Sequence, residues 1–245
     1  MLGDDLDVVD GAAVGAWIES RLGGEWGAVT QQVPTGFEAY VRLFHAPVDG
    51  EGKLVTWAEV ARRLGRTAHR EMQWHQIVGS SDSSNFTGSK WTGSNPLLGQ
   101  LGLEELEPLC DLLAVHTADP DRCFFALCEI NNGPLVARIA PGEPRPLLKL
   151  PMGRDHLVVG GPLAAATQIP HLDSWEPAPG LIWPADRCWF VVSEVDFDST
   201  LIGGSRALVD ALVAAPDLEV YEVEPETLLT AFSDQLNPVP EPDEE

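Results

Sequence analysis

The sequence has no apolar run long enough to cross a membrane as a helix. Hydrophobic residues make up 44% of its 245 residues, which is ordinary for a globular protein. No stretch approaches the roughly 18 consecutive apolar residues of a membrane span. Before the first base, Arg21, the chain carries four aspartates, which is the reverse of the start of a signal peptide. We therefore expect a cytoplasmic protein that does not bind membranes.

Basic residues are scarce: 15 lysines and arginines stand against 38 acids, and the net charge is −23. Such a surface repels nucleic acid and favours a basic protein partner, because complementary fields speed encounter. The arginines of one segment, Arg62, Arg63, Arg66 and Arg70, lie in a helix–glycine–helix pattern that superficially resembles a DNA-binding motif. The second half of that pattern has no clear apolar stripe, so we interpret these arginines as a surface feature and expect no nucleic acid.

Catalytic and nucleotide-binding motifs are missing as well. No Gly-x-Gly-x-x-Gly, Gly-x4-Gly-Lys-Ser/Thr, Gly-x-Ser-x-Gly or His-Glu-x-x-His occurs, so neither phosphate binding nor nucleophilic or zinc-dependent hydrolysis has a sequence signal. The four cysteines form no Cys-x-x-Cys pair, and we expect them to be reduced, buried thiols. The composition therefore favours a protein without catalysis.

The segment whose pattern predicts secondary structure most clearly is residues 181–205, LIWPADRCWFVVSEVDFDSTLIGGS. From Cys188 to Val195 it is apolar, aromatic and β-branched on both faces, which predicts a central, buried strand. Three carboxylates follow at alternate positions, Glu194, Asp196 and Asp198. Carboxylates so spaced at a strand end can share a Mg²⁺ or Mn²⁺ ion. The alternative is that they mark the point where a buried strand emerges into solvent.

The remaining pattern predicts an α+β, or mixed α/β, fold with a mostly antiparallel or mixed sheet flanked by helices. Helices are expected at residues 10–22, 56–64, 103–115, 206–214 and 225–236. Further strands are expected at residues 37–45, 123–130, 134–139, 147–150, 156–159 and 218–223, with an Asn-Gly hairpin turn before residue 134. We expect one globular domain over residues 1–236, with two lobes divided near residues 79–96 as the alternative. The acidic end, residues 237–245, is predicted to be disordered.

The most unusual feature of the composition is its eight tryptophans. Tryptophan in a loop is a candidate for a binding surface, whereas tryptophan in a strand or helix usually fills a core. Trp91, Trp175 and Trp183 fall in segments that read as loops. With Arg187, which follows the turn at Pro184, they form the predicted binding surface.

Four segments carry a family resemblance that spans most of the chain: residues 33–45 (VPTGFEAYVRLFH), 71–77 (EMQWHQI), 122–135 (RCFFALCEINNGPL) and 183–205 (WPADRCWFVVSEVDFDSTLIGGS). Together they resemble a family of conserved hypothetical proteins of actinobacteria. This family brings no established activity with it, so no functional residue is carried over.

Two functions follow as hypotheses. The first is a non-catalytic, cytosolic protein-binding protein of regulatory or immunity-like kind, with a partner that is basic. The second is a divalent-metal-dependent enzyme centred on Glu194, Asp196 and Asp198. The first needs no cofactor and the second needs Mg²⁺ or Mn²⁺.

Overall fold

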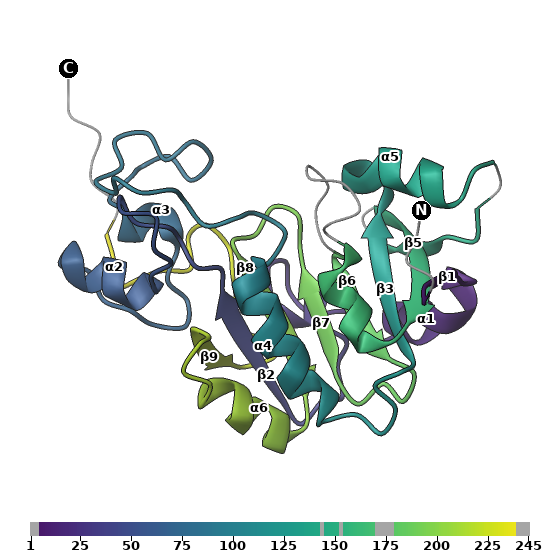
Figure 1. The fold of residues 1–245 in the computed structure, drawn as a ribbon. Helices are drawn as coiled ribbons and strands as arrows, with labels where there is room; N and C mark the ends of the chain where they lie inside the picture. The colour runs from purple at the N-terminus through teal and green to yellow at the C-terminus, as the bar shows by residue number, and fades with distance from the viewer. Residues whose placement is uncertain (1–4, 143–144, 152–153, 170–178, 239–245) are drawn as a thin grey trace.

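The structure, a computed structural model, describes residues 5–142, 145–151, 154–169 and 179–238. These residues form a large antiparallel sheet with helices on both faces, so the fold is mixed α+β (Figure 1). The helices are α1 (Gly11–Glu19), α2 (Trp57–Arg63), α3 (Trp74–Ile77), α4 (Leu103–Ala114), α5 (Glu129–Ile139) and α6 (Arg206–Val213), with 3-10 turns η1 (Val29–Gln31) and η3 (Leu163–Thr167). The strands are β1 (Asp7–Val8), β2 (Ala39–Phe44), β3 (Cys123–Cys128), β4 (Leu148–Leu150), β5 (Arg154–Gly161), β6 (Leu181–Pro184), β7 (Phe190–Ser193), β8 (Ser199–Gly204) and β9 (Val220–Val223). Within the described ranges no helix has the length and apolar character to cross a bilayer.

The strands follow the order β1-β5-β3-β6-β7-β8-β2-β9, with β4 paired to β5. The strand predicted at residues 188–195 is β7, an interior strand whose regular pairing is limited to Phe190–Ser193. Residues 199–204, which lack a clear strand pattern because two glycines end them, form β8 beside it. Ser205 then caps α6, since its hydroxyl accepts a hydrogen bond from the Leu208 N–H at 3.2 Å.

The two faces of the sheet are covered by different helices. On one face Trp189 and Val191 join a core with α4, α5 and α6. On the other face Phe190 and Val192 pack with Trp17 of α1. Consecutive residues of a strand point to opposite faces, so the alternation in the sequence around β7 is confirmed on both sides.

A third core lies beyond one end of the sheet, where α2 and α3 sit (Figure 1). Phe44 at the end of β2 packs on Trp57 with ring centroids 4.6 Å apart, and Trp57 packs on Trp74 at 5.0 Å. Residues 79–96 form no regular helix or strand, as predicted. Trp91 holds this long loop against the core, because its ring meets Trp74 edge-on at 6.2 Å.

The hairpin predicted from the Asn-Gly dipeptide is wrong. Residues 129–139 form α5, with a kink at Asn132, whose side chain donates a hydrogen bond to the Cys128 carbonyl at 3.1 Å. Strand β3 is already paired on both edges, by β5 and β6, so no edge remains for a further hairpin strand. Leu135 and Val136 are instead buried in the core under α5.

The helix predicted at residues 225–236 is also wrong. The Val29 N–H donates to the Thr227 carbonyl and the Leu229 N–H donates to the Gly27 carbonyl, so this segment makes its backbone hydrogen bonds with residues 27–30. Tertiary pairing overrides helix propensity here. Phe232 is 85% exposed.

Asp234, which is buried, connects the end of the described chain to the segment between α2 and α3 through hydrogen bonds. Its carboxylate accepts hydrogen bonds from the His69 ring at 2.8 Å, from the Gln73 N–H at 3.3 Å and from the backbone and side-chain amides of Asn237 at 2.9 and 2.8 Å. Asn237, which was assigned to the disordered tail, is therefore inside the fold. Residues 239–245 lie outside the described residues.

Replacing Asp234 by asparagine is expected to lower the free energy of unfolding by about 2–3 kcal/mol, because several buried donors lose a charged acceptor. These hydrogen bonds hold the pKa of Asp234 below its ordinary value. The stability it contributes is therefore present above the ordinary aspartate pKa and is lost as the pH falls through the lower, folded value. Urea unfolding measures both effects. The matched control is Glu226→Gln, an exposed acid nearby, and equal unfolding midpoints for the two variants would contradict the prediction.

Candidate functional site

The three carboxylates of the predicted metal site lie in the connection between β7 and β8 and are divided between two arginines. Arg154 forms ion pairs with Glu194 and with Asp196, the latter at 3.1 Å. Asp198 faces Arg42 instead, at 3.6 Å. Because these residues form a loop and not a strand, spacing by two does not place them on one face. Within the described residues no group of three or more His, Cys, Asp or Glu side chains is arranged to hold a metal ion.

The predicted binding surface is not assembled as one patch. Trp183 lies in β6, is fully buried and stacks on Phe190 with centroids 6.0 Å apart. The expectation that it is exposed is therefore wrong, because the residues before Pro184 form a strand and not a loop. Trp91 is half-buried, Arg187 is exposed in the turn after β6, and Trp175 lies outside the described residues.

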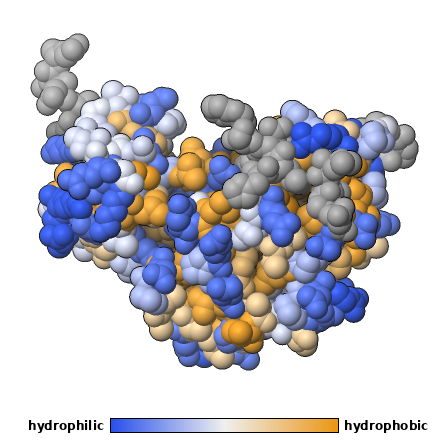
Figure 2. Space-filling model, in the orientation of Figure 1, coloured by the Kyte–Doolittle hydropathy of each residue, from blue (hydrophilic) through white to orange (hydrophobic). Residues whose placement is uncertain are grey.

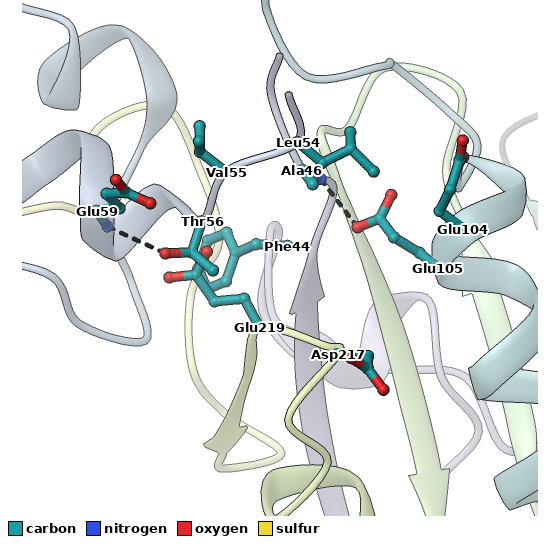
Figure 3. Close-up of a pocket in the computed structure, with 10 residues that line it drawn as sticks. All are labelled: Phe44, Ala46, Leu54, Val55, Thr56, Glu59, Glu104, Glu105, Asp217 and Glu219. Atoms are coloured by element: carbon teal, nitrogen blue, oxygen red, sulfur yellow. Dashed lines mark hydrogen bonds between the residues drawn. The ribbon is translucent and has the colours of Figure 1, made fainter. Parts of the chain in front are cut away.

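The structure reveals a different candidate site, a cavity of about 180 Å³ between α2, α4 and the start of β9 (Figure 3). Its apolar wall comes from the end of β2 and the segment before α2. Five carboxylates from three separate parts of the chain complete the lining, which consists of Phe44, Ala46, Leu54, Val55, Thr56, Glu59, Glu104, Glu105, Asp217 and Glu219. Among the described residues, no lysine, arginine or histidine lines it. Figure 2 shows hydrophobic and hydrophilic residues side by side over this part of the surface.

Glu105 is positioned by the first turn of α4, where it occupies the third helical position. One carboxylate oxygen accepts the Gly102 N–H at 3.3 Å, which closes the start of the helix, and the other accepts the Ala46 N–H at 2.9 Å (Figure 3). Glu105 therefore ties α4 to the end of β2. Burial raises its pKa to about 7, even though both hydrogen bonds favour the ionised form.

Glu219 precedes β9 and closes the start of α2 from a distance in sequence. Its carboxylate accepts the Trp57 N–H and, at 2.8 Å, the Ala58 N–H. The Thr56 hydroxyl accepts the Glu59 N–H at 3.1 Å as the local cap. Burial raises the pKa of Glu219 to about 7 as well. The N-termini of α2 and α4 thus both lie at the cavity. At each of them a glutamate carboxylate accepts hydrogen bonds from backbone N–H groups that the helix leaves without a partner.

The other acids of the cavity differ in what they bind. Glu59 pairs with Arg63 on α2 at 2.5 Å. Glu104 and Asp217 are exposed, and neither makes an ion pair or a side-chain hydrogen bond within the described residues. The cavity therefore carries a strong negative field with two carboxylates available to a ligand. A cation whose stem packs on Leu54 and Val55 matches this lining in charge and polarity.

Sequence reasoning missed this site because its acids are distributed over residues 59, 104–105 and 217–219. The Thr56 and Glu59 pair was visible as a capping signal, but the partner of α2 that matters most, Glu219, is 162 positions from Trp57. Only the sheet register, which sets β9 beside β2, brings them together.

Comparison of the chain with models of known protein families, with curated proteins and with solved structures finds no match.

Proposed function

We propose that this chain is a cytoplasmic, non-catalytic protein of the actinobacterial family that it resembles, and that its acidic cavity receives a lysine or arginine side chain of a basic partner protein, in a regulatory or immunity-like role. One observation carries the proposal: five carboxylates and an apolar wall line a cavity that no basic side chain lines within the part of the chain that the structure describes. The net charge of −23 adds a long-range attraction for such a partner.

The lining favours an organic cation over a metal ion. Divalent metals need several oxygen ligands converging at 2.0–2.6 Å, roughly the range for Mg²⁺ and Ca²⁺, and no such convergence exists among the described side chains. Glu105 and Glu219 already accept backbone N–H groups, so they shape the cavity and are not free to transfer protons to a substrate. Leu54, an exposed apolar side chain, lines the cavity as well.

The test uses a capped hexapeptide of alternating lysine and leucine as the probe, titrated against the protein and followed by calorimetry. We expect Glu104→Gln/Asp217→Asn to weaken binding by about tenfold, the effect of roughly 1.4 kcal/mol. The matched control is Glu107→Gln/Asp111→Asn, which removes two exposed charges from α4 outside the cavity. Affinity is also expected to rise from pH 6 to pH 8, because Glu105 and Glu219 ionise in that range.

The same hexapeptide with glutamate in place of lysine is expected not to bind. Equal losses in the cavity variant and the control variant would show that only the overall negative field attracts the peptide, and the cavity would then have no role.

A further inference from the structure

A second site is indicated on the other face of the sheet, around Trp17 of α1. Trp17 is 7% exposed, and its ring meets Phe190 edge-on at 5.8 Å. Two guanidinium groups lie over the same indole: Arg21 and Arg187, each with its central carbon 5.5 Å from the ring centroid. Neither arginine lines the acidic cavity. The chain therefore gathers two exposed cations on one aromatic side chain.

The chain has 38 acids for 15 bases. Other described arginines use that excess, as Arg42, Arg154 and Arg206 do by pairing with carboxylates. Arg21 and Arg187 make no ion pair within the described residues. Cation–π contact with an indole stabilises each guanidinium but supplies no counter-ion. An anion bound by the guanidiniums would supply one.

The nearest acid in the sequence, Asp186, is turned away from this pair. Its carboxylate accepts hydrogen bonds from the Thr117 hydroxyl at 2.9 Å and from the Ala118 N–H at 2.8 Å, on the opposite side of the turn. Arg187 itself has a φ of 58°, a left-handed conformation that is rare for residues other than glycine. The turn thus directs the acid to one side and holds the arginine against Trp17.

Trp17 adds an independent observation. Its indole N–H is buried and has no hydrogen-bond acceptor among the described residues. Buried donors without an acceptor are rare and call for an explanation such as a ligand or ion. An oxyanion that the exposed guanidiniums bring to the indole supplies the acceptor that this N–H lacks.

We propose that Trp17, Arg21 and Arg187 form a binding site for a phosphate group. A phosphate dianion matches the two guanidinium charges, and its oxygens accept hydrogen bonds in the paired geometry that arginine presents. The site is independent of the acidic cavity and of the function proposed for it. A free phosphate ion and the phosphate of a monoester share this chemistry.

The experiment follows the indole ¹H–¹⁵N resonance of Trp17 during titration with inorganic phosphate, glycerol phosphate and acetate at constant ionic strength. We expect the resonance to shift with both phosphates and not with acetate. Tighter binding of glycerol phosphate supports the site with a phosphorylated ligand, and equal binding supports it with the free ion. Binding of acetate as tight as that of phosphate would overturn the proposal.

Three variants complete the test. Arg21→Gln/Arg187→Gln is expected to weaken phosphate binding at least tenfold. Arg187→Gly removes one guanidinium while suiting the left-handed turn, so the fold is preserved and a clear loss of affinity is still expected. The matched control, Arg62→Gln/Arg70→Gln, removes the same charge elsewhere. Undiminished binding in the first two variants, or an equal loss in the control, would show that phosphate does not use this site.

Discussion

Replacing Arg42 by methionine is expected to lower the free energy of unfolding by about 3–5 kcal/mol, the range for breaking a buried ion pair by removal of one partner. Arg42 is 2% exposed in β2. Its guanidinium faces Asp198 at 3.6 Å and donates hydrogen bonds to the Ser199 hydroxyl at 2.9 Å and to the Met72 carbonyl at 2.9 Å. Methionine fills the space but leaves the carboxylate and the carbonyl without their donor.

Urea unfolding measures the loss, and two further variants separate its causes. In Arg42→Met/Asp198→Asn the uncompensated charge is gone, so we expect part of the stability to return. The control Arg206→Met breaks an exposed pair with Glu222 at 2.7 Å and is expected to cost at most about 1 kcal/mol. A loss for Arg42→Met as small as that of the control would contradict the prediction. If Arg42→Met does not fold, Arg42→Lys retains the charge and provides a milder comparison.

Arg42 also joins β2 to the connection between α2 and α3. Besides Met72, its guanidinium donates to the Arg70 carbonyl at 3.2 Å, and these residues lie between α2 and α3. The sheet is thereby joined to the end of the molecule that supplies the α2 wall of the cavity. A weakened junction is expected to widen the cavity and to reduce binding of the cationic peptide.

The local sequence predicts the structure where a segment caps its own backbone N–H groups, or where its side chains alternate between the two faces of a sheet. Asp10 and Thr56 accept the N–H groups that begin α1 and α2, and the strand after Cys188 alternates between two cores. For that reason the helix starts, the interior strand and the mixed α+β class could be predicted from the sequence.

Non-local pairing decided the rest. Pro134 and the Asn-Gly dipeptide before it are compatible with either a turn or the start of a helical segment, and the occupied edges of β3 select the helix. The proline after Trp183 predicts a loop, yet pairing with β3 makes Trp183 part of β6. The cavity is the extreme case, since the start of α2 is closed by Glu219, which is 162 positions from Trp57, while Glu105 of α4 also binds the Ala46 N–H at the end of β2.

Replacing both of these glutamates, in Glu105→Gln/Glu219→Gln, is expected to change how stability depends on pH. In the folded chain burial raises the pKa of each glutamate from 4.5 to about 7. The folded state then holds protons that the unfolded state has released, so their contribution is fully present below pH 4.5 and is lost as the pH rises to about 7. A shift of this size corresponds to about 3 kcal/mol for each group.

Two buried histidines oppose the glutamates. Burial lowers the pKa of His45 and of His156 from 6.5 to about 4. The unfolded state takes up protons on these side chains before the folded state does, so their contribution to stability falls as the pH drops from 6.5 to 4. Between pH 4.5 and 6.5, where the two windows overlap, the four groups nearly cancel in the wild-type chain.

Glutamine at both positions keeps a side-chain oxygen that accepts hydrogen bonds from the helix N-termini. It removes the two carboxyl groups whose protonation opposes that of the histidines. The contribution of His45 and His156 is then no longer offset, and we expect the stability of the variant, relative to that of the wild type, to rise by several kcal/mol from pH 4.5 to 6.5. Urea unfolding at four pH values between 4.5 and 7.5 measures the slopes, with Glu107→Gln/Asp111→Asn, which changes two exposed acids outside the cavity, as the control whose slope should match the wild type. Parallel slopes for all three proteins would mean that Glu105 and Glu219 are already ionised in the folded chain at acidic pH. Cation binding at the cavity would then lose the pH dependence expected above, because no proton would remain to be displaced.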